Sequence, residues 1–189
     1  LICIIFSLYQ CKTRGLVSQD PAEKVVDLNS SPVISPSESI KMMKAEEGFE
    51  VKLVASEPLI STPVALLFDH KDRIWVLEMS GYMPDSVGTG EDIPSGKVVI
   101  LEDTNHDGVA DERKIFLDSL VLPRAFCLIE NGILVAEPPN LWYYEIINDK
   151  PGKRVLVDDK YTGEGNVEHH PNGLLRAMDN WIYNAKSSK

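Results

Sequence analysis

The chain has 189 residues, of which 43% are hydrophobic, and a formal net charge of −10. This length and apolar content suffice for one domain with a packed core and exclude a disordered chain. The acidic balance argues against nucleic acid as a partner, because phosphate binding requires clustered Lys and Arg, and it suits cation binding.

The first eleven residues are mostly apolar and end at Cys11. The run is too short to span a bilayer but suits the hydrophobic part of a secretory signal. A hydrophobic run ending in a lone Cys resembles a bacterial lipoprotein signal, although the two residues before Cys11 are larger than such signals prefer. We expect an exported, periplasmic or cell-surface protein, membrane-anchored in a bacterium through lipid on Cys11. A clipped transmembrane anchor or an ordinary signal is the alternative.

A linker and a short helix follow, at 12–34 and 35–48. The linker is rich in Ser, Pro and charged residues and has weak periodicity. Ser35 is a good N-cap, Pro36 suits the first helical position, and Glu38 completes a capping box. Because the chain starts with Leu and stops after a strand-like run, we expect it to be the N-terminal piece of a longer protein.

From residue 49 onward the sequence predicts strands. Residues 49–56 alternate, and the later apolar runs are separated by turn residues. Three segments share one order of Pro, apolar strand, polar turn and second strand, and the first two are followed by a third strand at 97–103 and 140–146. The three segments are 63–79, 123–139 and 171–187.

Repeats of about 40–50 residues, each a small antiparallel sheet, are the signature of a β-propeller. We therefore predict an all-β fold, with 49–189 forming a partial β-propeller of about two to three blades of antiparallel strands behind a short N-terminal helix. A parallel β-helix or a sandwich is the alternative. In a propeller, first strands line the channel, so their starts and the ends of second strands share one face. This face would collect Arg124, Asn172, Glu78 and Glu137.

Four stretches resemble a known family in combination: "GFEVKLVASEPLISTPVALLFDHKDRIWVLEMSGY", "ILEDTNHDGVADERKIFLDSL", "ILVAEPPNLWYY" and "EHHPNGLLRAMDNWIYNA". They look like the N-terminal propeller of bacterial membrane-bound dehydrogenases, which is similar to that of soluble PQQ-dependent glucose dehydrogenase. The resemblance covers about residues 35–189. It implies a sugar or polyol substrate, PQQ, and electron transfer to a cytochrome c domain. No C-x-x-C-H motif occurs in the chain, so haem is expected only in a domain beyond it.

Two groups of polar residues are candidates for binding and catalysis. Arg124 suits carboxylates, such as those of PQQ or an acidic sugar, and Asn172 suits a hydroxyl. Glu78 and Glu137 could bind sugar hydroxyls or a cation, or belong to a salt-bridge network that holds the blades together. His169 and His170 are candidates for the base of alcohol oxidation. Adjacent side chains in an extended segment point in opposite directions, so at most one histidine faces the channel, and both could be rim residues without a role.

The stretch "DTNHDGVAD" matches the front of an EF-hand-type loop, in which hard oxygen ligands favour Ca²⁺. Gly108 permits the sharp turn. The expected position is a hairpin between a third and an outer strand, so a bound ion would stiffen the hairpin. A polar turn without metal is the alternative. The candidate ligands are Asp103, Asn105, Asp107, the backbone carbonyl of Val109, and Asp111.

Three further side chains are expected in the core. Cys127 lies in an apolar strand with no disulfide partner, as a buried small hydrophobe does. Trp75 and Trp181 occupy the same position in two repeats, which favours packing over ligand stacking.

Three functions follow from these features. The leading one is an exported PQQ-type dehydrogenase that oxidises a sugar or polyol and passes electrons to a cytochrome domain. The others are a non-enzymatic carbohydrate- or protein-binding surface propeller and a calcium-dependent hydrolase or lactonase.

Overall fold

The computed structural model describes residues 33–162 and 169–185. Its contacts divide the chain into two units, Leu1–Ser35 and Pro36–Lys189, and all strands described below belong to the second unit. Cys11 and the predicted signal segment lie outside the described residues.

The only helix among these described residues is α1, Pro36–Met42. It begins where the Ser-Pro pair predicted, but residues 43–48 are not helical. No residue of α1 is buried. Because a short helix without packing gains little from its few hydrogen bonds, it does not extend through residue 48.

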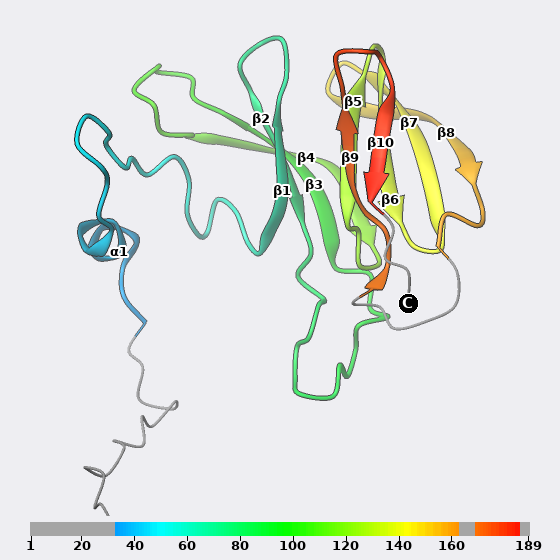
Figure 1. The fold of residues 1–189 in the computed structure, drawn as a ribbon, viewed down its shortest axis with the longest axis horizontal. Coiled ribbons are helices and arrows are strands. Elements are labelled where there is room, and N and C mark those ends of the chain that lie inside the picture. The colour runs from blue at the N-terminus through cyan, green and yellow to red at the C-terminus, as the bar shows by residue number, and fades with distance from the viewer. Residues whose placement is uncertain (1–32, 163–168, 186–189) are drawn as a thin grey trace, which may run out of the picture. The chain divides into compact units, whose positions relative to one another are not determined.

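The first sheet contains four antiparallel strands in the order β1-β2-β3-β4 (Figure 1). Each strand pairs with the next one along the chain. The strands are β1 Pro63–Phe68, β2 Ile74–Glu78, β3 Gly96–Glu102 and β4 Glu112–Leu120.

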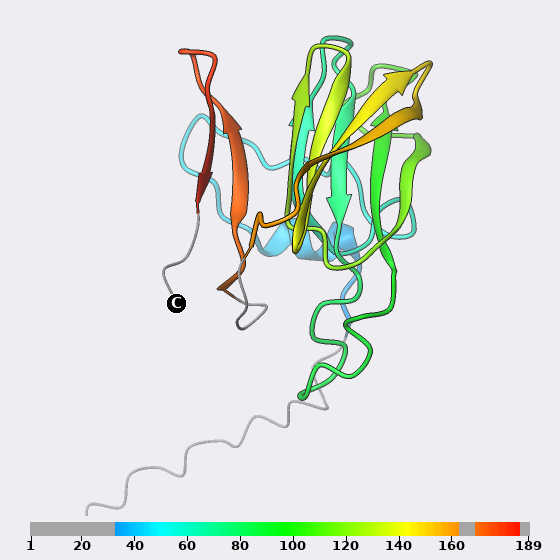
Figure 2. The ribbon, with the colours of Figure 1, turned by 90° about the vertical axis from the view of Figure 1, so that its right-hand side faces the viewer.

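The second sheet repeats this arrangement with the order β5-β6-β7-β8, and a two-stranded hairpin of β9 and β10 follows. Strand β9 of the hairpin contacts strand β5 of the second sheet. Figure 2 shows the hairpin beside that sheet. The strands are β5 Ala125–Ile129, β6 Gly132–Glu137, β7 Asn140–Ile147, β8 Lys150–Asp158, β9 Asn172–Arg176 and β10 Ile182–Ala185.

The chain therefore has the predicted all-β fold of antiparallel sheets with one short helix among the described residues. All three repeated segments form the strand pairs expected of them. Residues 49–56, whose alternation indicated a strand, form none. Their Val54 carbonyl accepts one hydrogen bond from the Ala110 N–H at 2.8 Å, and Ala55 packs on the first sheet.

The core lies between the two four-stranded sheets. Alternate residues of β2 and β6 point into it, because successive side chains of a strand leave opposite faces. Trp75 and Leu77 of the first sheet meet Ile133 and Val135 of the second. Trp75 also makes an edge-on contact with Phe116, with ring centroids 4.9 Å apart.

Each sheet is covered on its other face as well. Val76 and Val99 of the first sheet pack against the segment that contains Leu59. Ala136 of the second sheet packs against Leu174 of β9. Burial on both faces explains why the middle strands are almost continuously apolar rather than alternating.

The two repeated tryptophans have different environments. Trp75 is 1% exposed, as predicted, whereas Trp181 is 69% exposed, so the prediction for Trp181 was wrong. The reason is tertiary, because no third strand or further sheet covers β10 in the described part of the chain.

Candidate functional site

A groove runs along the first strands of the two sheets and of the hairpin. Its volume is about 460 Å³, within the range of small-molecule sites. Its walls are mostly apolar, with Arg124 and Asn172 at the starts of β5 and β9. The structure thus brings together the two residues that the repeat placed at matching positions. The apolar lining includes Val64, Leu66, Leu67, Phe126, Leu174 and Leu175.

Arg124 is half-buried and lacks the partners that a buried guanidinium needs. Its Nε and Nη2 atoms are buried and form no hydrogen bond. The guanidinium carbon lies 6.0 Å from the ring centroid of Tyr82, a weak cation–π distance. Burial lowers the pKa of Arg124, and the nearby Tyr82 and Glu91 oppose this effect. A buried donor without an acceptor costs about 1–3 kcal/mol, so this end of the groove favours an anionic ligand group.

Glu78 and Glu137 do not line the groove. Glu78 is 2% exposed, accepts a hydrogen bond from the Ser61 N–H at 2.9 Å and pairs with Arg113 at 2.9 Å. Glu137 accepts one from the Val121 N–H at 2.8 Å. Glu78 thus forms a salt bridge, but its partner is Arg113 of β4 in the same sheet and not Arg124, so this pair does not hold the two sheets together. Both glutamates fasten the segment that leads into the first strand of their own sheet.

The two candidate histidines lie just before β9. His169 is exposed and His170 is half-buried. Neither is among the described residues that line the groove. In the third repeat, Asn184 stands at the position that Glu78 and Glu137 occupy in the first two repeats. Its side-chain oxygen accepts a hydrogen bond from the Tyr161 hydroxyl at 2.8 Å.

The candidate calcium loop joins β3 to the edge strand β4, the position that the repeat predicted. Asp103 accepts a hydrogen bond from the Gly108 N–H at 2.8 Å, and Gly108 has a φ of +91°. Asn105 accepts one from the Asp107 N–H at 2.9 Å. Burial raises the pKa of Asp103, but the backbone donors outweigh it and hold that pKa below its usual value.

The other two candidate ligands, Asp111 and Val109, also take part in hydrogen bonds within this loop. The Asp111 carboxylate accepts the Thr104 hydroxyl at 2.9 Å, and the Val109 N–H donates to Asp107 at 2.8 Å. The loop is thus closed by its own hydrogen bonds. Among the described residues, no group of three or more His, Cys, Asp or Glu side chains is arranged to hold a metal ion, so calcium at this loop stays a prediction from the sequence pattern.

An ion-pair link between the two sheets was not identified from the sequence. Arg73 pairs with Asp69 at 2.8 Å and with Asp149 of the β7–β8 turn at 2.7 Å. Asp69 also accepts the indole N–H of Trp75 at 3.0 Å. The Asp69 side chain also accepts the backbone N–H groups of Lys71 and Arg73. Asp often begins a turn in this way, so the turn itself could be recognised from the sequence. Nothing in the sequence indicates that Asp149 is the distant partner.

Cys127 is buried and free, as predicted. Burial raises the pKa of its thiol, so the thiol is a weak nucleophile at neutral pH.

These features define an all-β protein whose antiparallel sheets pack face to face beside a groove along their first strands. Residues 35–189 match the family model of a domain of unknown function (DUF7133), and the chain belongs to that family. No curated protein and no solved structure matches the chain. Across 33–162 and 169–185, no helix is long and apolar enough to cross a membrane.

Proposed function

We propose that the chain forms part of a β-propeller in which the two sheets are blades and the groove follows the channel. The support is that both sheets share one strand order and pack face to face. The first strands β1, β5 and β9 also contact one another in sequence. Neighbouring blades of a propeller have this arrangement.

The groove is a binding site for a small organic ligand that carries a carboxylate. The observation that carries this proposal is the pair of buried, unpaired nitrogens of Arg124. A carboxylate accepts two parallel hydrogen bonds from one guanidinium, so it would satisfy both atoms. Asn172 at the same end would bind a hydroxyl or carbonyl, and the apolar walls would contact a planar or carbon-rich body.

The activity proposed for this site is that of an exported dehydrogenase acting on a sugar or polyol, with PQQ as the carboxylate-bearing group. Arg124 fits the carboxylates of PQQ, which when bound supplies the two-electron acceptor. Arg124 would hold and orient the group, and the apolar walls would exclude water. His169 or His170 would take the hydroxyl proton of the substrate. Lipid on Cys11 would anchor the protein, and a cytochrome c domain would receive the electrons.

A non-enzymatic binding protein for carbohydrate is the second candidate. It is favoured by one observation, namely that neither histidine lines the groove in the described residues. A binding site without a base holds a ligand but does not oxidise it.

Titration of the full chain with PQQ, with and without Ca²⁺, tests the site. We expect saturable binding that Arg124→Met weakens by at least about tenfold, because one charge-assisted pair contributes about 1.5–3 kcal/mol. The matched control is Arg154→Met, because Arg154 stacks on Trp142 and lies outside the groove. Equal binding by Arg124→Met, or no binding by the unmodified chain, would contradict the PQQ site.

Dye reduction with a panel of sugars and polyols then separates the two functions. Reduction that requires PQQ indicates the dehydrogenase. Ligand binding without dye reduction by any substrate indicates the second candidate.

A further inference from the structure

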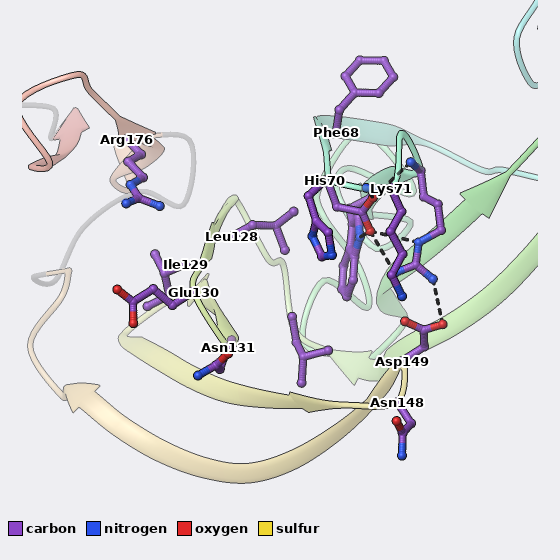
Figure 3. A pocket seen from close by; sticks show the side chains of 15 residues that line it. Phe68, His70, Lys71, Leu128, Ile129, Glu130, Asn131, Asn148, Asp149 and Arg176 are labelled. Atoms are coloured by element: carbon purple, nitrogen blue, oxygen red, sulfur yellow. Dashed lines mark hydrogen bonds and ion pairs between the residues drawn. The ribbon is translucent and has the colours of Figure 1, made fainter.

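A second cavity lies at the other end of the same first strands. Its volume is about 420 Å³. It is lined by the β1–β2 and β5–β6 turns, by Asn148 and Asp149 of the β7–β8 turn, and by Arg176 at the end of β9 (Figure 3). Arg124 and Asn172 are not among its lining residues, so it is separate from the groove of the proposed function.

One wall of this cavity is held rigidly by Asp69. The Asp69 carboxylate accepts hydrogen bonds from the Lys71 N–H at 2.8 Å and from the Arg73 Nε at 2.9 Å. Arg73 extends the network to Asp149 on the second sheet. The turns of both sheets are therefore fixed relative to one another before any ligand arrives, which lowers the entropic cost of binding.

The remaining polar side chains around the cavity are free to bind. In the described structure they form no hydrogen bond or ion pair with one another or with other side chains. They include donors, acceptors and groups that do both, and they surround an apolar floor of Leu128, Ile129 and Ile146. Figure 3 shows them on both sides of the cavity. They are His70, Lys71, Glu130, Asn131, Asn148 and Arg176.

The charges around the cavity give no net preference for an ion of either sign. With histidine neutral, three cationic side chains are matched by three carboxylates. An anion or a cation would each meet both attractive and repulsive side chains, so neither gains a net electrostatic attraction. Lining residues of both signs thus favour a ligand that is neutral and that both donates and accepts hydrogen bonds.

We propose that this cavity binds a neutral carbohydrate of one or two sugar units. Hydroxyl groups donate and accept hydrogen bonds and so match both kinds of free side chain. The cavity volume suits a ligand of this size. The apolar floor would contact the carbon face of a sugar ring.

Calorimetric titration of the full chain with the neutral disaccharide cellobiose tests this proposal, with the acidic digalacturonate as the charged comparison. We expect cellobiose to bind more tightly than digalacturonate. The double variant Lys71→Ala with Asn131→Ala should weaken cellobiose binding by at least about tenfold, because it removes two hydrogen-bonding side chains of about 1 kcal/mol each. Both residues are exposed, so their side chains are not part of the core.

Two control variants make the test specific. Lys44→Ala removes an exposed lysine outside the cavity and should leave cellobiose binding unchanged. Arg124→Met should also leave it unchanged, so this site and the PQQ site can fail independently. The proposal is overturned if cellobiose, maltose and mannobiose all fail to bind. Preference for digalacturonate would indicate an anion site instead, and undiminished binding by the double variant would place the sugar elsewhere.

Discussion

At the scale of single residues, two glutamates at matching repeat positions have the same structural task. Glu78 and Glu137 each end a second strand and each accept a backbone N–H from the segment before the first strand. Their difference is burial and charge pairing. Glu78 also pairs with Arg113, whose Nε is buried and unpaired, whereas Glu137 forms no ion pair within the described residues.

This difference predicts unequal effects of the same substitution. Glu78→Gln should lower the free energy of unfolding by about 2–4 kcal/mol, because it leaves the partly buried Arg113 without a counter-charge. Glu137→Gln should cost less than about 1 kcal/mol, because the amide oxygen still accepts the Val121 N–H. Urea unfolding of both variants measures this. Equal losses would show that the ion pair adds nothing to the hydrogen bond.

At the scale of elements, the β3–β4 loop is closed by hydrogen bonds of its own Asp and Asn side chains. It also holds the preceding chain, since Ala110 donates to Val54. An ion bound to Asp103, Asn105 and Asp107 would neutralise carboxylates that otherwise repel one another. Calcium would then stabilise a hairpin at the sheet edge and take no part in chemistry in the groove.

We therefore expect Ca²⁺ to raise the melting temperature of the full chain, and EDTA to reverse the shift. Free Ca²⁺ at 100 times the dissociation constant of the site would add about 2.7 kcal/mol to the free energy of unfolding. Asp103→Asn with Asp107→Asn should abolish the calcium-dependent shift. The control is Asp118→Asn on β4, outside the loop. No heat of Ca²⁺ binding in calorimetry, together with no shift, would leave a metal-free polar turn.

At the scale of the whole molecule, the link through Arg73 joins the two sheets at their turn ends. Burial raises the pKa of Asp69, but hydrogen bonds from Trp75, Lys71 and Arg73 outweigh it and lower the pKa from 3.8 to about 2. The folded-state pKa is therefore below the unfolded one. This carboxylate stabilises the fold above about pH 4, and that contribution is lost as the pH falls towards 2.

Unfolding by urea at several pH values tests this link. Between pH 4 and 2 we expect Asp69 to account for a loss of roughly 1–2 kcal/mol, reduced by solvent screening. Asp69→Asn should remove that part of the pH dependence. Asp72→Asn in the same turn should retain it, because the exposed Asp72 carboxylate forms no hydrogen bond or ion pair with any described residue. Identical pH profiles for both variants would refute the assignment.

Much of the fold could be predicted from local patterns. The three repeated segments become strand pairs because apolar runs and turn residues act over a few neighbours. The segment at 49–56 shows the limit. Its alternation suits a strand, but within the described part of the chain the only backbone hydrogen bond that joins it to a distant segment is the one from the Ala110 N–H to Val54. Trp181 shows the same limit, since its position in the repeat predicted a burial that only a covering sheet could supply.

The candidate site was predictable only in part. The strand repeat, a turn around Asp103 and the matching positions of Arg124 and Asn172 could be predicted from the sequence, because these features follow from short-range spacing. Only the tertiary structure decided that Arg124 is left unpaired while Glu78 pairs with Arg113, and that Arg73 reaches Asp149. These outcomes depend on which side chains the packing of the sheets brings within a few ångströms, and residues far apart in sequence carry no local signal of that distance.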